Sequence, residues 1–376
     1  MPYSLLSESI RLEIVQHALD NGVRNADYQI LGELEVPKSV RLLSPTPCEI
    51  LPRQFGFWFN TGPGFSAPDI VTYRHRLVEV LDAWVLGQDG VPVYAQGWVD
   101  TAALNYVRWH LNGCQVERID GGIATRSPSR QIRGSVFIGF NAGHNNYAHF
   151  VTDQLPLLYY YKIHLAPLGI KLLLPTDQAP FFREYIQLLD VPSELVELIG
   201  DEVVSVERLI HPSVFSFDAI PLSVVDLLKA FRNEVPSAVG AARRRLFVSR
   251  KDAPARTLLN ERALEKLLAA QGYETLVPGT LSVADQIAAF RNAECVVAAH
   301  GAALANIVFC EPGTRIVELF PEYTVSPHFW VLASHFDLSY GTVIGTSFDQ
   351  DHALQDQSGS WEGAFVISEA ALLRAL

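Results

Sequence analysis

The second half of the sequence predicts an α/β fold with a parallel, doubly wound sheet. From about residue 245 onward, short apolar runs alternate with amphipathic helical segments, and the connections between them are short. Strict alternation of this kind is typical of parallel strands covered by helices on both faces. The chain has 376 residues, of which 49% are hydrophobic and 19% charged, so it is long enough to bury two such sheets.

Individual elements of this half are marked by local signals. Gly272 stops a helix, and Ser282 with Asp285 has capping-box spacing, with Asp in place of the usual Glu. Pro236, Gly240 and three consecutive arginines indicate a linker over 233–244. We expect strands at 245–250, 273–277, 295–299, 314–319 and 340–344, and helices at 260–271, 282–293, 301–309, 327–335 and 368–376.

The first half is less regular. Residues 1–70 are rich in proline and other loop signals, and 74–96 alternates apolar with polar residues, which indicates antiparallel strands joined by a turn at 88–90. Beyond Gly134 we expect strands at 135–139, 170–174 and 203–210, a helix at 181–189, and a helix at 147–164 that kinks or breaks at Pro156.

Charge and composition exclude several classes of protein. The formal net charge of -12 argues against a nucleic-acid partner, which usually requires a basic face. No apolar run reaches the length of a membrane span, and the first residues lack the pattern of a signal peptide. The four cysteines are widely spaced, with no Cys-x-x-Cys pair, so we expect reduced thiols and a cytoplasmic location.

The most informative motif is the apolar run 295–299, which ends in His300-Gly301 and is followed by good helix formers up to Asn306. A helix that opens at the carboxyl end of a buried strand presents free N–H groups to anions. Ligands of open α/β sheets bind at the same edge. The alternative is a purely structural strand-to-helix turn.

A second motif is the pair His149 and Asp153. Four residues apart on a helix, they share one face, so the carboxylate can hold one imidazole nitrogen and raise its basicity, as a general base requires. Asn145 and Asn146 precede this helix and can cap it. The alternative is a capped helix with a structural His–Asp pair on its surface.

Two more charged residues lie where buried strands are expected to end. Arg250 ends the strand 245–250, with Arg256 and Asn260 close behind, and a guanidinium binds phosphate oxygens in bidentate fashion. Glu318 ends the strand 314–319, where a carboxylate suits ribose or sugar hydroxyls, although a structural salt bridge would explain it equally. We interpret Lys251 and 243–245 as a solvated face.

Several common motifs are absent from the sequence. It contains no Gly-x-Gly-x-x-Gly, P-loop or Gly-x-Ser-x-Gly pattern, and no zinc-ligand spacing. Asp349-Gln350-Asp351 matches the Asp-x-Asp that binds metal-diphosphate in some sugar transferases, but it falls in a polar loop. We therefore expect no metal site.

Taken together, these residues resemble glycosyltransferase family 61, including its bacterial capsular-polysaccharide members. The resemblance covers roughly 135–320, and Ala303 departs from it where the family often has glycine, which puts close approach of a diphosphate there in question. The segments that carry it are Asn146–Asp153, Ser249–Lys251, Arg256–Glu261, Leu281–Ile287, His300–Asn306 and Ile316–Glu318.

The resemblance implies a GT-B architecture, in which two Rossmann-like doubly wound domains face a central cleft. The expected domains are 1–235 on the acceptor side, with an irregular, β-rich first 130 residues, then 236–350 for the donor, and 351–376 as a C-terminal tail and helix. It also implies an inverting enzyme that requires neither metal nor cofactor. The expected partners are a nucleotide-sugar donor and a saccharide acceptor, in surface polysaccharide synthesis. The apolar content permits a lipid-linked acceptor and peripheral contact with the inner face of a membrane.

By this resemblance His149, oriented by Asp153, is the expected base, and Asn145 and Asn146 lie on the acceptor side. The expected donor-binding residues are Arg250, Arg256, Asn260, His300, Gly301, Ala302, Ala303, Asn306 and Glu318. Three alternatives remain open: a His-x-x-x-Asp acyltransferase, a non-catalytic saccharide-binding or assembly protein, and a nucleotide-sugar epimerase.

Overall fold

The computed structural model divides the chain into two compact units, each of which is described by itself. The first contains Tyr3–Lys38 and Val71–Phe231, and the second contains Ser39–Ile70 and Arg232–Leu376. Side chains are described for 81–87, 90, 127–211, 224–235, 243–253, 256–322, 325–347 and 363–376, and the backbone alone for further strand and helix residues.

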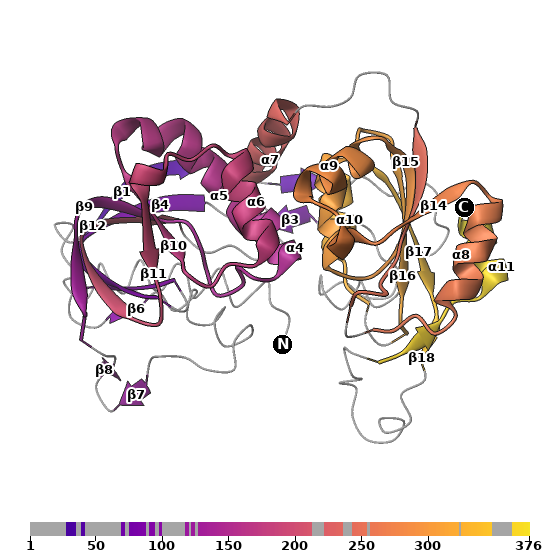
Figure 1. Cartoon of the computed structure of the whole chain (residues 1–376), viewed down its shortest axis with the longest axis horizontal. Helices are drawn as coiled ribbons and strands as arrows, with labels where there is room; N and C mark the ends of the chain where they lie inside the picture. Colours follow the sequence, from indigo (N-terminus) through magenta and orange to yellow (C-terminus); the bar gives the residue numbers. More distant parts are fainter. Residues whose placement is uncertain are drawn as a thin grey trace. The chain divides into compact units, whose positions relative to one another are not determined.

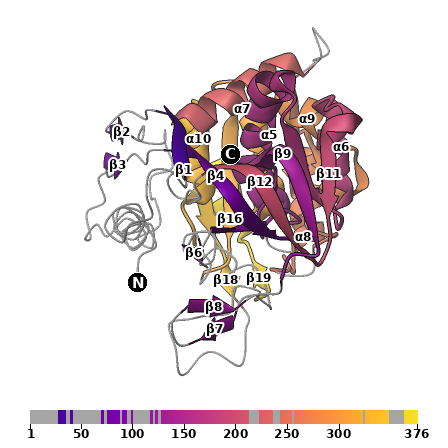
Figure 2. The same cartoon turned by 90° about the vertical axis from the view of Figure 1, so that its left-hand side faces the viewer.

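An eight-stranded mixed sheet forms the first unit (Figure 2). Its parallel part consists of β11 (Val196–Ile199), β10 (Lys171–Pro175), β9 (Arg130–Ile138) and β12 (Val203–Pro212), in that order. The antiparallel part consists of β4 (His75–Leu86), β5 (Val91–Tyr94), β6 (Trp98–Val99) and β1 (Tyr28–Leu34), which pairs with β4. The antiparallel strands expected over 74–96 are confirmed.

The expected α/β class is confirmed, and the sheet of the first unit is mixed, whereas the resemblance implies a doubly wound parallel sheet in both domains. Only four strands of the first unit are parallel, because β4, β5 and β6 follow one another through short turns. Adjacent strands joined so directly can pair only antiparallel. Four short strands complete the described N-terminal elements: β2 (Ser39–Arg41), β3 (Asp69–Val71), and the hairpin of β7 (Glu117–Ile119) with β8 (Gly122–Ala124).

The helix expected over 147–164 is a chain of short helical types between β9 and β10. It comprises α4 (Tyr147–His149), a π-helical turn η1 (Phe150–Gln154), α5 (Leu155–Tyr160), a second π-turn η2 (Tyr161–Leu165) and a 3₁₀ turn η3 (Ala166–Leu168). Pro156 lies in the first turn of α5, and the irregular π-turn η1 directly precedes that helix. The remaining helices of this unit are α6 (Pro180–Leu188), η4 (Ser193–Leu195) and α7 (Leu222–Glu234), whose last residues belong to the second unit.

The second unit contains the parallel sheet that the sequence predicts. Its order is β14 (Tyr273–Leu276), β13 (Arg244–Val248), β15 (Ala293–Ala299), β16 (Arg315–Phe320) and β17 (Ser339–Ile344), and every neighbouring pair is parallel. Counted along the chain this is the order 2-1-3-4-5, so the winding direction reverses between β13 and β15. Open α/β sheets bind ligands at the carboxyl ends of the strands at such a point.

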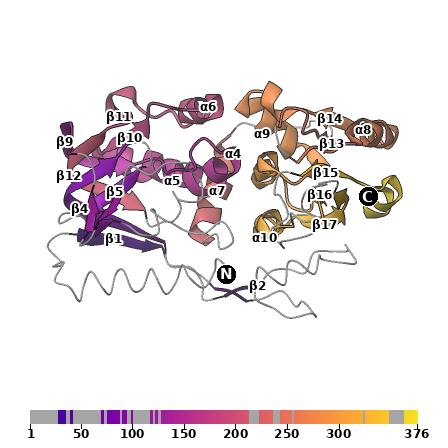
Figure 3. The same cartoon turned by 90° about the horizontal axis from the view of Figure 1, so that it is seen from below.

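Helices cover both faces of this sheet, as Figures 1 and 3 show. On one face lie α8 (Glu261–Ala270) and α11 (Glu369–Ala375), and on the other α9 (Val283–Arg291) and α10 (His328–His335). The short elements are η5 (Pro278–Thr280), η6 (Ala302–Phe309), β18 (Thr346–Ser347) and β19 (Phe365–Val366).

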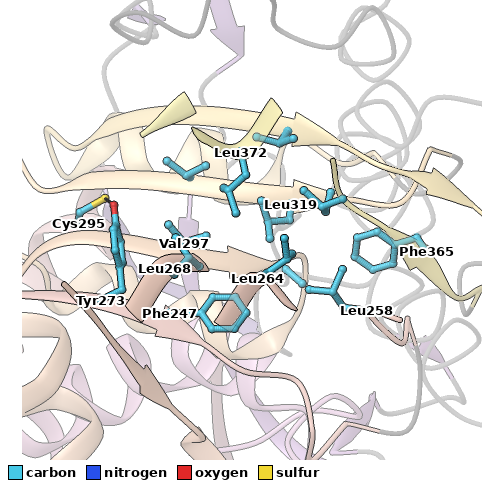
Figure 4. Close-up of a cluster of buried hydrophobic side chains, with 14 residues drawn as sticks. Phe247, Leu258, Leu264, Leu268, Tyr273, Cys295, Val297, Leu319, Phe365 and Leu372 are labelled. Atoms are coloured by element: carbon cyan, nitrogen blue, oxygen red, sulfur yellow. Dashed lines mark hydrogen bonds between the residues drawn. The ribbon is translucent and has the colours of Figure 1, made fainter. Parts of the chain in front are cut away.

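The core between the sheet and α8 with α11 is apolar (Figure 4). Val317 and Leu319 of β16 lie in it, together with Phe247, Leu264 and Leu372 from the neighbouring elements. Side chains alternate between the two faces of a strand. The residue between Val317 and Leu319 therefore points to the opposite face, which α9, η6 and α10 share.

The helix expected at 301–309 is the 3₁₀ helix η6. All its side chains from Leu304 to Phe309 are buried, so packing on every side decides its conformation and overrides its good α-helix formers. Cys295 and Cys310 are free and buried, as expected. Cys48, Cys114, Asp349–Asp351 and most of the predicted linker lie outside the described residues. Among the helices of the described part, none has both the length and the apolar character needed to cross a bilayer.

Candidate functional site

The main candidate site is the carboxyl edge of β13 and β15, where the winding of the parallel sheet reverses. Arg250 follows β13, His300 follows β15, and Ala302 with Ala303 begins η6. Arg250, Ala302 and Ala303 are half-buried, so this edge is reachable from outside. The sequence predicted all four at one edge, and the structure brings them there.

The Arg250 side chain packs against the turn that follows β15. Its Nη1 donates a hydrogen bond to the carbonyl oxygen of His300 at 2.9 Å. A Cβ on Gly301 would lie 1.6 Å from the same Nη1. Glycine is therefore required here for the space that the guanidinium fills.

Glu261 shapes the loop from which Arg250 extends. This first residue of α8 is 8% exposed and accepts hydrogen bonds from Ser249 Oγ at 2.5 Å and from the Arg250 amide at 3.1 Å. Asp252 of the same loop accepts a bond from the amide of Gly279, which follows β14, at 2.8 Å. The loop after β13 is thus held by α8 and by the loop after β14.

Arg250 is half-buried, and the charges of Arg256, Asp252 and Glu261 act on it. Burial, followed by the charge of Arg256, lowers the pKa of Arg250 to about 10, although Asp252 and Glu261 act in the opposite direction. Arg256 itself adopts a left-handed backbone conformation, with φ of 54°, which is strained for a residue with a side chain. Two close guanidiniums in a half-buried place favour an anionic ligand.

His300 is held from several sides. It is 6% exposed, its ring stacks on Phe320 at 5.2 Å between centroids, and Phe329 of α10 lies 5.6 Å away. Its Nδ1 lies 2.5 Å from Oε1 of Glu318. Burial, then the charges of Arg256, His328 and Arg250, hold its pKa well below the usual value.

Glu318 has an environment that the sequence did not predict. It lies within β16 rather than at its end, is 0% exposed, and its Oε2 accepts a hydrogen bond from the Tyr340 hydroxyl. Burial raises the pKa of its carboxyl well above the ordinary value, and the Tyr340 hydrogen bond and Arg256 oppose this only in part. The expectation that Glu318 holds a ribose is therefore corrected: both oxygens face inward, toward His300 and Tyr340.

Two predicted donor-binding asparagines make structural contacts. The Asn260 side chain donates to the carbonyl oxygen of Ile367 at 2.7 Å and accepts from its amide at 3.1 Å, which ties α8 to the C-terminal segment. Asn306 is completely buried and donates to Gln286 Oε1 and to the carbonyl oxygen of Ala303, both at 3.1 Å. These bonds shape the loops behind the site, and a direct donor contact by either side chain stays a prediction.

Sequence reasoning missed two residues of this cluster. His328, the first residue of α10, acts electrostatically on His300, and Tyr340 reaches Glu318 from β17. The sequence could have indicated His328, because its predicted helix follows the strand that carries Glu318. It gave no indication of Tyr340, since only the register of β16 with β17 brings the Tyr340 and Glu318 side chains together.

The first unit contains the predicted His–Asp pair. His149 Nδ1 lies 3.1 Å from Asp153 Oδ2, which confirms the predicted contact, and the side chains are 17% and 5% exposed. The hydroxyl of Thr152 donates to the other carboxylate oxygen at 2.6 Å. The carboxylate of Asp153 thus engages Nδ1 of the imidazole.

Asn145 and Asn146 have different roles in the loop after β9. Asn146 caps α4 by accepting from the Ala148 amide at 3.0 Å, as predicted. The Asn145 side chain donates to the Asp177 carbonyl oxygen at 3.0 Å and accepts from the Ala179 amide at 2.8 Å, which joins the loops after β9 and β10. Its acceptor-side role stays a prediction.

No group of three or more His, Cys, Asp or Glu side chains in the described ranges is arranged to hold a metal ion. Arg250 and Arg256 place positive charge at this edge.

Fold and site together define an α/β protein that places two arginines at the switch point of a parallel sheet. Residues 147–317, which are 171 of the 376 and just under half of the chain, match the family model described as Glycosyltransferase 61. The match supports glycosyltransferase family 61 and, with it, glycosyltransferase activity on a donor and an acceptor. It does not distinguish the capsular-polysaccharide members. The matched segment includes His149, Arg250 and His300. No curated protein matches the chain.

Proposed function

We propose that the chain is an inverting, metal-independent glycosyltransferase that moves a sugar from a nucleotide-sugar donor to a hydroxyl of a saccharide acceptor. The proposal includes a GT-B arrangement, with the donor on the second unit and the acceptor on the first. It also includes a place in surface polysaccharide synthesis, where the acceptor carries a glycan or a lipid-linked glycan.

One observation carries the donor half of this proposal: the guanidinium of Arg250 is seated on His300 and Gly301 at the switch point of the sheet. Arg256 adds a second cation, as its effect on the pKa of Arg250 indicates. Together with the amides of Ala302 and Ala303, they supply the charge and N–H donors that a diphosphate requires. Such groups stabilise the negative charge that develops on a leaving diphosphate.

The reaction is a single displacement. The acceptor oxygen forms a bond to the anomeric carbon as the bond from that carbon to the diphosphate oxygen breaks, and the electron pair leaves with the diphosphate. His149 Nε2 takes the proton of the acceptor hydroxyl, while Asp153 holds Nδ1. Attack on the face opposite the leaving group inverts the anomeric centre.

A thermal-shift panel of nucleoside diphosphates and nucleotide sugars tests this function. A ligand at about 100 times its Kd adds about 2.7 kcal/mol to the free energy of unfolding, so one nucleotide series should raise the melting temperature clearly. Arg250→Ala should abolish that rise while the unliganded melting temperature stays close to the wild type. Lys251→Ala is the matched control, because Lys251 pairs with Glu265 on an exposed face.

The result also separates the alternatives. Stabilisation by nucleoside diphosphates, with donor hydrolysis in the absence of acceptor, supports the transferase. Release of free coenzyme A from an acyl donor, without nucleotide binding, would identify a His-x-x-x-Asp acyltransferase. Saccharide binding without nucleotide binding would identify a non-catalytic binding or assembly protein.

A further inference from the structure

A short hydrogen bond links the imidazole of His300 to a carboxyl group with no exposed surface. His300 Nδ1 and Glu318 Oε1 are 2.5 Å apart, and the other carboxyl oxygen accepts from the Tyr340 hydroxyl. At this distance between Nδ1 and Oε1, one proton lies between the two atoms. For a neutral imidazole the position of this proton sets the property of Nε2: with the proton on Nδ1, Nε2 is an acceptor, and with the proton on the carboxyl, Nε2 carries a hydrogen.

Binding of an anionic ligand requires one particular protonation state of His300. A diphosphate presents only acceptor oxygens, so a contact with His300 requires a proton on Nε2. In the structure no hydrogen-bond partner of this Nε2 is found among the described residues, and the His300 side chain is 8% exposed. With Nε2 protonated, Nδ1 is either protonated as well, giving an imidazolium, or accepts a proton from Glu318.

The groups around His300 oppose an imidazolium. Arg250 and Arg256 follow β13, and His328 approaches from α10; together with burial they hold the pKa of His300 well below its usual value. Glu318, from β16, is the described carboxyl that faces the ring, while Tyr340 of β17 faces Glu318. Burial raises the pKa of Glu318 well above its ordinary value, which shifts the balance toward the neutral acid.

We propose that Glu318 is a positioning residue that works as a neutral carboxylic acid: it donates its proton from Oε1 to His300 Nδ1 and so fixes His300 as the Nε2–H tautomer, which binds the leaving diphosphate. This rests on the proposed function and deepens it. The Glu318 proton stays between the two side chains throughout. His300 contributes a hydrogen bond, and the proton of the acceptor hydroxyl goes to His149.

Loss of that proton has a defined consequence. Above the raised pKa of Glu318, Nδ1 would carry the hydrogen and donate it to the carboxylate, and the Nε2 lone pair would face the diphosphate. Affinity should then fall about tenfold for each further pH unit. In Glu318→Gln, the amide NH₂ donates to Nδ1 and the amide oxygen accepts from Tyr340, so the Nε2–H tautomer persists at every pH.

The direct test is nitrogen NMR of the unliganded full chain with labelled histidine side chains. The 11 histidines give separate tautomer signals, and His300→Gln identifies the signal of His300. We expect the Nε2–H tautomer in the wild type at neutral pH and its conversion to Nδ1–H at alkaline pH, with no conversion in Glu318→Gln. An Nδ1–H tautomer or an imidazolium at neutral pH overturns the proposal. Because no ligand is added, this outcome is independent of whether nucleotides bind.

The pH dependence of Kd for a nucleoside diphosphate gives the second readout, since its phosphates are fully ionised above neutral pH. Nucleoside diphosphate binding by the wild type and by the control Glu265→Gln should weaken at alkaline pH, whereas binding by Glu318→Gln should not. Should Glu318→Gln fail to fold, Tyr340→Phe serves instead: it removes the hydrogen bond that lowers the pKa of Glu318, so the alkaline loss should move to higher pH. The wild-type profile in either variant overturns the proposal, and absence of nucleotide binding in every protein refutes the proposed function instead.

Discussion

Gly301→Ala is the sharpest available perturbation of the site, because it adds one methyl group at the place that the Arg250 guanidinium fills. The new Cβ would lie 1.6 Å from Nη1, whereas ordinary contact begins at 3.4 Å, so the guanidinium must move by roughly 1.8 Å. A misplacement of about 1 Å already costs on the order of 10² in rate, and loss of one donor to the developing charge about 10²–10³. We expect turnover and diphosphate affinity to fall within this range while the fold is kept, since the displaced group is the end of a flexible side chain.

The assay is donor hydrolysis together with calorimetric Kd for a nucleoside diphosphate, in a double-mutant cycle with Arg250→Ala. If Gly301 acts by giving Arg250 its place, Gly301→Ala should have little further effect once Arg250 is gone. Gly200→Ala is the matched control, because its Cβ would meet Thr176 Oγ1 at an ordinary 3.5 Å. Equal losses from Gly301→Ala in the presence and absence of Arg250 would refute the reasoning.

Three further changes have defined outcomes. Asn260→Ala should lower the free energy of unfolding by about 1–3 kcal/mol, because it leaves the backbone of Ile367 without its two side-chain hydrogen bonds. In urea titrations Asn292→Ala, which removes one side-chain hydrogen bond to the Ala288 carbonyl oxygen, should cost less, and equal costs would contradict the structural role of Asn260. His149→Ala and Asp153→Asn should both reduce transfer while nucleotide Kd stays at the wild-type value, and wild-type rates in both would remove the base from the mechanism. A chelator should leave turnover unchanged. Loss of turnover with the chelator, and its recovery when a divalent cation is added, would show that the arginines alone do not neutralise the leaving diphosphate.

The parallel sheet of the second unit could be predicted because its sequence signals are local and repeated. The central strands β13, β15 and β16 contain short apolar runs, α8 has an amphipathic pattern, and Gly272 and Ser282 mark helix ends. These signals place strand ends near Arg250 and His300, and they therefore predict that both residues lie at the carboxyl edge of the sheet.

The first unit was harder to predict because its sheet depends on pairing between distant segments. Which strand β12 joins, β4 on one side and β9 on the other, is decided by packing across the chain and leaves no local pattern. The π-turn at Phe150–Gln154 is similar: the sequence indicates a helix, and tertiary packing sets its hydrogen-bonding type.

The candidate site shows the same division. His149 with Asp153 has a fixed spacing, so the contact could be read from the sequence. The inward orientation of Glu318 could not be predicted, because it depends on where β16 ends. The strand continues to Phe320, which places Glu318 inside the sheet. Tyr340 entered the cluster only through the register of β17.

A crystal structure of the full chain with a nucleoside diphosphate would test most directly whether the second unit binds a diphosphate at the switch point of its sheet. We predict that the phosphate oxygens lie within hydrogen-bonding distance of the Arg250 guanidinium and of the amides that begin η6, with His300 Nε2 facing them. A diphosphate bound away from the carboxyl ends of β13 and β15, with Arg250 still seated on His300 and no phosphate in reach, would contradict the account.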